Sequence, residues 1–533
     1  MKKISLKGFS ISKYFKFSER KATFKKEIVG GIVTFLAMAY ILAVQPAMIH
    51  TVDVINGTNK LPIGGIFLAT VISSFFATMV MGILANVPIS LAPGMGINAF
   101  FVFTVCLILR MDPYVAMSSV LVSGWLYFFI AITPARKYIA NALPKNIKIA
   151  IGAGIGFFLA FLGLQQSGII QSDAQIITGA GVPPTVITAT SVKIGNFKNP
   201  LVLLAVSLII LTFILHTLKI KGSIIIAMLV GVAILAIMYA SGVSVVKQSG
   251  AFKIKPFESA FNELGTVAGK GWTHLGQMFS NPKAYIAIFV FLYSDFFDTT
   301  GTIFAIDEQV GISKREGTDW IGKANISDSI GTLFGASLGS STVTSYIEST
   351  AGATSGAKTG FAACVTGTLF LLSMFMWPIM GVFMPLNNAS MAVHNQASPG
   401  AIMPITSPSL VLVGSLMMMQ LKEFDWKEAI DVPVVFLTIL MMVLTYNIST
   451  GIAVSIVIFV ILNFFAGLKQ RWDIWRGNPV SFVDDSQEMI LSDMSKKSKI
   501  SETKDYWKRI NIPIVVMFII ALAFFGTMPL YLY

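Results

Sequence analysis

Apolar segments about as long as a membrane is thick recur along this 533-residue chain, and they constrain its fold more than any other feature. A membrane-spanning helix needs about 20 mostly apolar residues. Charged residues make up only 12% of the chain, roughly half the fraction in a soluble domain. We therefore expect an all-α polytopic membrane protein in a lipid bilayer. The sequence predicts about fourteen spans, at residues 28–49, 62–84, 88–109, 113–133, 146–166, 199–217, 222–242, 284–306, 325–339, 341–356, 359–383, 401–420, 430–447 and 450–467.

The loop charges predict how these spans are oriented. Loops after even-numbered spans carry most of the basic residues, such as Lys219 and Lys221 after the sixth, which indicates a cytoplasmic N-terminus. Segment 243–283 is a basic exception, but long segments cross the membrane largely regardless of charge. The first 27 residues lack the apolar core of a cleavable signal, and no organelle-targeting segment appears, so a plasma or bacterial inner membrane is expected. The stretch 511–531 could be a fifteenth span or an interfacial segment.

Equivalent spans recur at a nearly constant offset. The first and eighth spans start at 28 and 284, and the fourth and eleventh at 113 and 359, so they lie about 250 residues apart. Such an offset predicts two halves of seven spans each, and an odd number of spans gives the halves opposite topology. Inverted repeats place a solute site at their interface near the membrane midplane. Near-matching offsets also arise by accident in a chain dense with helices.

Two of the predicted spans contain residues that interrupt a helix. In the third, NVPISLAPGMGINAFF (86–101), Pro88 and Pro93 cannot donate backbone hydrogen bonds, and Gly96 allows close backbone approach. The tenth, SLGSSTVTSYIESTAGATSG (337–356), begins with a β-prone run and becomes helix-compatible later. Non-helical backbone at membrane depth is tolerated only where it is buried in protein or lines a cavity. Facing half-helices would direct their NH groups at one point, whereas the alternative is tight Gly/Ser packing between helices.

Two acidic residues lie deep inside apolar segments, Asp298 in the eighth span and Glu348 in the tenth. An ionised carboxylate at the bilayer centre costs about 2.5–3.5 kcal/mol even on the gentler insertion scales. A membrane protein keeps such a group where it faces a cavity and binds a solute, a proton or both. The two acids therefore indicate transport.

Other classes of function lack their signals. No HExxH pattern lies in the spans, and no nucleophile–base pair or metal cluster is evident there, so an intramembrane enzyme is not expected. Cys106 and Cys364 are the only cysteines, which argues against a disulfide framework or a metal site, and we expect no cofactor. A channel would show a repeated filter sequence. The net charge of +13 fits cytoplasmic loops better than a nucleic-acid partner.

Several segments in order resemble one known family. APGMGINAFF (92–101), DFFDTTGT (295–302) and TSYIESTAGATSGAKTG (344–360) resemble the signature segments of the AzgA-like purine permeases. These are the hypoxanthine/guanine/adenine branch of the nucleobase–ascorbate transporter superfamily. The likeness extends from about residue 20 to residue 467, nearly the whole membrane part.

The resemblance implies a seven-plus-seven inverted repeat with a core and a gate domain, and short strands before the half-helices of spans 3 and 10. It also implies elevator motion of the core and leaves a homodimer through the gate domain open. The predicted organisation is a basic cytoplasmic N-terminus (1–27), core halves (28–133 and 284–383), gate halves (146–242 and 401–467), an external loop (243–283) and a basic segment with a C-terminal hydrophobic stretch (468–533).

The resemblance further implies that Asp298, Glu348 and Asn98 take part in binding a purine nucleobase. A carboxylate accepts from ring NH groups, while an amide both donates and accepts. We expect Glu348 to contact the purine edge, beside backbone NH groups near Tyr346 and Ser349, with Gly96 and the Tyr346 ring in the same site. Asp298 makes a second contact or, like Glu348, carries a coupled proton. Xanthine, uracil, a small anion and Na⁺ coupling remain as alternatives.

The remaining polar and aromatic candidates receive supporting roles. Asp295 shares a helix face with Asp298 and is expected to support it. Asp328 is expected to start the ninth helix or to bond the scaffold. Phe100 and Phe101 could stack on a purine but are expected to pack within the protein.

Overall fold

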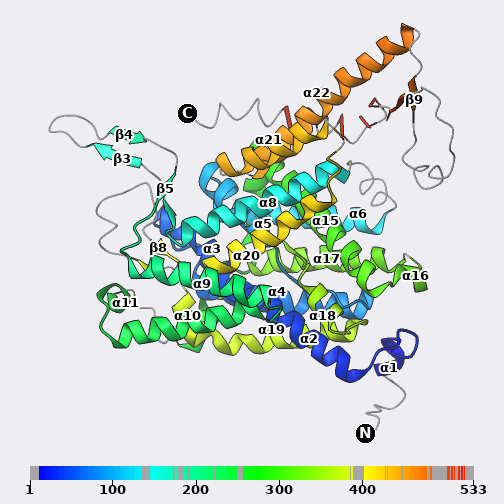
Figure 1. Cartoon of the computed structure of the whole chain (residues 1–533). Coiled ribbons are helices and arrows are strands. Elements are labelled where there is room, and N and C mark those ends of the chain that lie inside the picture. Colours follow the sequence, from blue (N-terminus) through cyan, green and yellow to red (C-terminus); the bar gives the residue numbers. More distant parts are fainter. Residues whose placement is uncertain are drawn as a thin grey trace. The chain divides into compact units, whose positions relative to one another are not determined.

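Helical elements lie at each of the fourteen segments predicted to cross the membrane (Figure 1). The third and the tenth also contain a short strand, as predicted, and the strand β8 (Ala401–Ile402) lies at the start of the twelfth. The first seven consist of α2 (Phe24–Met38) with α3 (Ile41–Asn56), α4 (Ile63–Val80) with the π-helix η1 (Met81–Ala85), β1 (Leu91–Pro93) with α5 (Met95–Ala99) and the π-helix η2 (Phe100–Ile108), α6 (Pro113–Ile132), α8 (Lys145–Gln166), α9 (Pro200–Thr217) and α10 (Ser223–Ala240).

The second seven begin with the longest helix, which carries Asp298. They consist of α15 (Pro282–Val310), α17 (Asp319–Leu338), β6 (Val343–Ser345) with α18 (Ser349–Thr354), α19 (Gly360–Leu372) with the 3₁₀ helix η3 (Ser373–Phe383), α20 (Ser407–Met417) with the 3₁₀ helix η4 (Met418–Glu423), α21 (Asp431–Leu444) and α22 (Ile448–Trp475). By length and composition, eight helical stretches in the described part of the chain are long and apolar enough to cross a membrane. The predicted class, an all-α polytopic membrane protein, is confirmed.

The connections carry further short elements. The described residues of segment 243–283, predicted as a loop, include four short helices. Glu263 from the second of them accepts hydrogen bonds from the amides of Gly64 (2.6 Å) and Gly65 (3.3 Å) at the start of α4. The connecting elements are α1 (Ile11–Tyr14), α11 (Ser244–Gln248), α12 (Phe257–Val267), α13 (Lys270–Thr273), α14 (Leu275–Phe279), α16 (Ser313–Glu316), and the strand pairs β2 (Ile170–Gln171) with β5 (Lys193–Ile194), β3 (Ala174–Ile177) with β4 (Thr185–Thr188), β7 (Leu386–Asn387) with β8 (Ala401–Ile402), and β9 (Val480–Phe482) with β10 (Ser501–Thr503).

A computed structural model describes the chain in two compact units, Met1–Pro134 with Gly156–Leu416 and Ala135–Ile155 with Met417–Tyr533. The first ten residues and most of the predicted stretch 511–531 lie outside the described residues, as does most of 468–510. The described residues are 11–133, 145–171, 174–177, 185–188, 192–220, 222–248, 252, 256–317, 319–383, 386–387, 401–426, 428, 430–445, 448–476, 480–482, 501–503, 506–507, 509–510, 514–515, 518–519 and 521–522.

The two interrupted spans meet through their strands. β1 and β6 pair antiparallel, with Leu91 opposite Ser345 and Pro93 opposite Val343. The Gly94 amide donates to the Thr342 carbonyl at 3.0 Å, which extends the pairing by one residue. Proline removes a backbone donor and interrupts a helix, so this stretch needs a partner outside its own span. The partner comes from the other half of the sequence.

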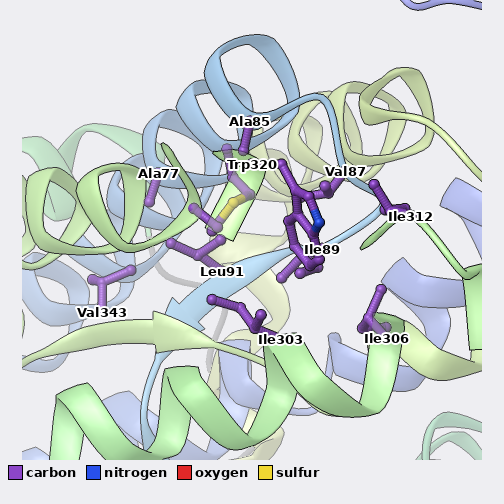
Figure 2. Close-up of a cluster of buried hydrophobic side chains, with 12 residues drawn as sticks. Ala77, Ala85, Val87, Ile89, Leu91, Ile303, Ile306, Ile312, Trp320 and Val343 are labelled. Carbon is purple, nitrogen blue, oxygen red and sulfur yellow. The ribbon is translucent and has the colours of Figure 1, made fainter. Parts of the chain in front are cut away.

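A cluster of buried apolar side chains holds the strand pair in place. Figure 2 shows Leu91, Ile89 and Val343 packed with Ile303 of α15 and with residues of α4 and η1. These side chains are almost completely buried, and interiors of this kind are close-packed, so the strands have little freedom to shift. The complete cluster is Ala77, Met81, Ala85, Val87, Ile89, Leu91, Ile303, Ile306, Ile312, Trp320, Ala324 and Val343.

The half-helix α18 packs on α2 through glycine. A Cβ atom at Gly352 would lie 2.6 Å from the Gly30 carbonyl oxygen and would overlap the Thr34 hydroxyl. Small residues let helix backbones approach closely in membranes. The contact fixes α18, and with it Glu348, against the first span.

Replacing Gly352 by alanine should therefore lower the melting temperature of the purified protein, because overpacking a tight contact costs about 1–3 kcal/mol. Gly265→Ala is the matched control, since a Cβ there would meet nothing within 4 Å. Thermal unfolding followed by size-exclusion chromatography measures both variants. Equal melting temperatures for the two would contradict the close approach of α18 and α2.

The segment before α2 is fixed by a buried arginine. Arg20 is 2% exposed, and its Nε and Nη2 donate to the two oxygens of Glu316 at 2.6 and 3.0 Å. Lys16 Nζ donates to the same carboxylate at 2.9 Å. The hydrogen bonds from Arg20, with those from Lys16, lower the pKa of Glu316 to about 2.

This depressed pKa predicts how stability depends on pH. A carboxylate whose folded pKa lies below its unfolded value stabilises the fold above the unfolded value, here 4.5, and the stabilisation is lost as pH falls towards about 2. The melting temperature of Glu316→Gln should therefore lie below that of the wild type at about pH 7, with the gap closing towards about pH 3. A gap that stays constant over this range would contradict the ion pair.

Candidate functional site

Glu348 lies where the second interrupted span turns from strand to helix. It is the residue before α18, its side chain is half-buried, and its Oε1 accepts a hydrogen bond from the Tyr40 hydroxyl at 2.8 Å. Tyr40 is 1% exposed and stands at the break between α2 and α3. The carboxylate is thus oriented by a buried phenol while part of it remains accessible.

Asp298 lies in the middle of α15 and is exposed, although its neighbours Asp295 and Thr299 are buried. α15 contacts α18. Asp298 and Glu348 lie near enough for their charges to interact. The structure therefore brings together the two acids that the sequence singled out.

Asn98 lies on α5, which follows β1 within the first interrupted span, and is fully buried. The Ser341 hydroxyl donates to its Oδ1. Within the described part of the chain, its Nδ2 has no hydrogen-bond partner. Gly96, on the same short helix, is half-buried, and α5 contacts α15. The Asn98 side-chain amide is therefore a buried donor that can still give a hydrogen bond.

Tyr346 connects the two strands. Its hydroxyl donates to the Pro93 carbonyl at 2.5 Å, its amide donates to the Ser90 carbonyl at 3.0 Å, and its side chain is 6% exposed. The Ser349 amide donates to the Tyr346 carbonyl at 3.1 Å. The amides of Tyr346 and Ser349, which we expected beside a ligand, are therefore engaged within the chain. A stacking role for the Tyr346 ring stays a prediction.

A comparison with known families matches residues 25–454 to the Permease family (Xan_ur_permease). The chain belongs to this permease family. It is 38% identical over 474 residues to the guanine/hypoxanthine permease PbuG of Bacillus subtilis, covering 88% of this chain and 98% of that one. It is also 33% identical to the guanine/hypoxanthine permease PbuO of the same organism, covering 85% and 94%.

Among solved structures, the permease resembles the transmembrane domain of BicA, a cyanobacterial bicarbonate transporter. The TM-score is 0.53 at 13% sequence identity, with 82% of this chain and 98% of that one covered. At this identity the likeness shows the fold alone. It shows that the permease has the predicted inverted-repeat fold.

Two further acids are buried in the scaffold of the permease. Thr332 donates to Asp295 Oδ2 at 2.8 Å, and Ser345 donates to Asp328 Oδ1 at 2.9 Å. Asp328 lies nine residues after the start of α17, so the expectation that it starts this helix is wrong, whereas the alternative that it bonds the scaffold is confirmed. Both acids stabilise the region around β6.

The aromatic residues of the third span pack within the protein. Phe100 and Phe101 are 2% and 0% exposed, and their rings lie 4.9 and 6.4 Å from that of Phe291 on α15. They support the wall of α5 and η2, as expected.

The sequence analysis missed Tyr40. The predicted span 28–49 is mostly apolar, and its proline, Pro46, lies six residues beyond Tyr40, so neither glycine nor proline marked the break itself. A lone tyrosine inside an apolar span was the available signal, because its hydroxyl requires a partner when buried. Among the described residues, no three histidine, cysteine or acidic side chains are grouped as metal ligands would be.

Ser345→Ala should destabilise the permease, since it removes a hydroxyl donor from the fully buried Asp328 carboxyl group. Losing one partner of a buried polar group costs about 1–3 kcal/mol. Ser207→Ala on α9 is the matched control, because its hydroxyl is exposed and bonds its own helix. Thermal unfolding should show a lower melting temperature for the first variant alone. No difference between the two would contradict the Ser345–Asp328 contact.

Proposed function

We propose that the permease imports purine nucleobases (hypoxanthine, guanine and adenine) across the cell membrane by proton symport. The observation that carries the proposal is the meeting of Asp298 and Glu348 where the two interrupted spans pair, with the Asn98 amide on the adjoining half-helix. The relatives PbuG and PbuO, named as guanine/hypoxanthine permeases, support the substrate class.

The chemistry of the three side chains suits a purine. The base presents NH donors beside ring-nitrogen and carbonyl acceptors along its edges. Glu348 and Asp298 accept from the NH groups, while the Asn98 Nδ2 donates to an acceptor. Tyr40 holds Glu348 at one oxygen and leaves the other for the ligand. Gly96 lets the base approach the α5 backbone.

Proton coupling follows from the proximity of the two acids. Two carboxylates close together repel each other when both are charged. A proton on either one removes this repulsion and restores a hydrogen-bond donor. Asp298 and Glu348 therefore couple proton binding to purine binding.

The proposed movement is that of an elevator. The core halves 28–133 and 284–383 carry all the proposed contacts and move relative to the gate halves 146–242 and 401–467. The N-terminus is cytoplasmic, and a homodimer forms through the gate. The paired strands support the movement of the core as one body, because they join its two halves.

Uptake of radiolabelled hypoxanthine into cells lacking their own purine permeases tests this function. Glu348→Gln and Asp298→Asn should each lower uptake about tenfold or more, since a hydrogen bond to a charged group contributes about 1.5–3 kcal/mol. A protonophore should abolish uptake by the wild type. Glu19→Gln and Asp319→Asn, both at exposed positions, are matched controls and should transport normally.

The alternatives give distinct results. If wild type present in the membrane takes up no purine, or if unlabelled xanthine, uracil or sulfate competes better than guanine and adenine, the substrate assignment is wrong. Normal uptake by both acid variants would agree with the proposed substrate but would show that Asp298 and Glu348 do not form its binding site. Uptake that depends on Na⁺ and is insensitive to the protonophore would show that the coupled ion is Na⁺ and not a proton.

A further inference from the structure

The residues before and at the start of the first span contact three distant parts of the chain. We call residues 14–27 the N-terminal clamp. Beyond its two bonds to Glu316, the Arg20 guanidinium donates through Nη1 to the carbonyl oxygens of Asn86 and Lys358, the latter at 3.1 Å. Every nitrogen of this buried side chain is thus engaged, as a buried guanidinium requires.

Other residues of the clamp contact the same segments of the chain. Glu27, fully buried, accepts from the backbone amides of Lys358 (2.8 Å) and Thr359 (3.3 Å). The Tyr14 hydroxyl donates to the Ile83 carbonyl at 3.0 Å. The Asn86 side chain in turn accepts from the Gly360 amide at 2.9 Å. Residues 83–86 and 358–360 are therefore connected both directly and through the clamp.

Aromatic packing adds to the grip. The rings of Phe15, Phe17 and Phe24 surround Phe361 at the start of α19, edge to face, with centroids 5.7, 5.8 and 5.5 Å away. Lys16 and Lys21 have φ values of 54° and 50°, a left-handed backbone that side chains other than glycine rarely adopt. Surrounding contacts must hold such a turn in place.

Each of the three segments that Arg20 contacts is connected along the chain to an element that carries or adjoins a proposed contact residue. Asn86 precedes β1 and α5, which carry Asn98. Lys358 follows α18, which begins after Glu348, and Glu316 follows α15, which carries Asp298. Since the guanidinium bonds all three segments, a change in its position shifts all three of them together.

We propose that Arg20 is a positioning residue, through which the N-terminal clamp sets the geometry of the two half-helices and of α15 around the substrate. This role rests on the proposed function for its transport readout. The clamp itself is tested without any substrate. Lys16 contributes less, because it is more exposed and pairs with Glu316 and with Glu19 of its own segment.

Hydrogen–deuterium exchange on the full-length purified protein tests the clamp. Arg20→Lys keeps the charge and loses the planar fork, and Arg20→Ala removes both. Exchange in both variants should accelerate in peptides covering 88–99 and 343–356 and stay unchanged in α9 (200–217). Glu19→Gln, an exposed neighbour in the same segment, is the control and should match the wild type throughout.

Uptake kinetics then separate positioning from mere folding. Per molecule in the membrane, the KM for hypoxanthine should rise about tenfold in Arg20→Lys while Vmax changes little, since small misplacements of contact groups cost up to about 100-fold. If wild type transports no purine, the proposed function fails and the exchange result alone still decides the clamp. Unchanged exchange at 88–99 and 343–356, or equal acceleration in α9, would overturn the proposal, as would an unchanged KM in a wild type that transports.

Discussion

The pairing of β1 with β6 is the interaction on which the rest of this permease depends. Inside a bilayer no water satisfies a free backbone group, so a span that leaves the helical path must find its hydrogen bonds within the protein. Here each interrupted span supplies them to the other. Glu348, Asn98 and the half-helices stand within a few residues of these strands along the chain, and α15, which carries Asp298, contacts β6, so their relative positions depend on one short ladder.

The four acids near the paired strands, Asp295, Asp298, Asp328 and Glu348, differ in how far their carboxylates are buried and hydrogen-bonded within the protein. Asp295 and Asp298 lie three residues apart on α15, yet one is buried against the Thr332 hydroxyl and the other is exposed. Asp328 likewise bonds Ser345, while Glu348 is half-buried with Tyr40 at one oxygen. The buried acids fix the scaffold. The more accessible acids keep capacity for a ligand or a proton.

The sequence predicted much of this because its strongest signals are local. Apolar length gave the spans, and Pro88, Pro93 and the Ser/Thr run before Glu348 gave the interruptions. Contacts between distant positions left no local signal. The Arg20–Glu316 pair joins residues 296 apart, and a basic N-terminal segment is usually solvated. Likewise α17 begins six residues before its predicted start, because its first turns are polar and resemble a loop.

The distance between β1 and β6 along the chain has a consequence for biosynthesis. About 250 residues separate the strands, and a ribosome adding about 5–20 residues per second needs roughly 10–50 seconds to supply them. During that time Leu91–Pro93 has entered the membrane region without its partner. The backbone groups of β1 that pair with β6 therefore lack their partners during this interval, and the proposed binding site forms only after the tenth span emerges. A nascent chain in this interval is a natural client for insertion factors that shelter polar backbone from lipid.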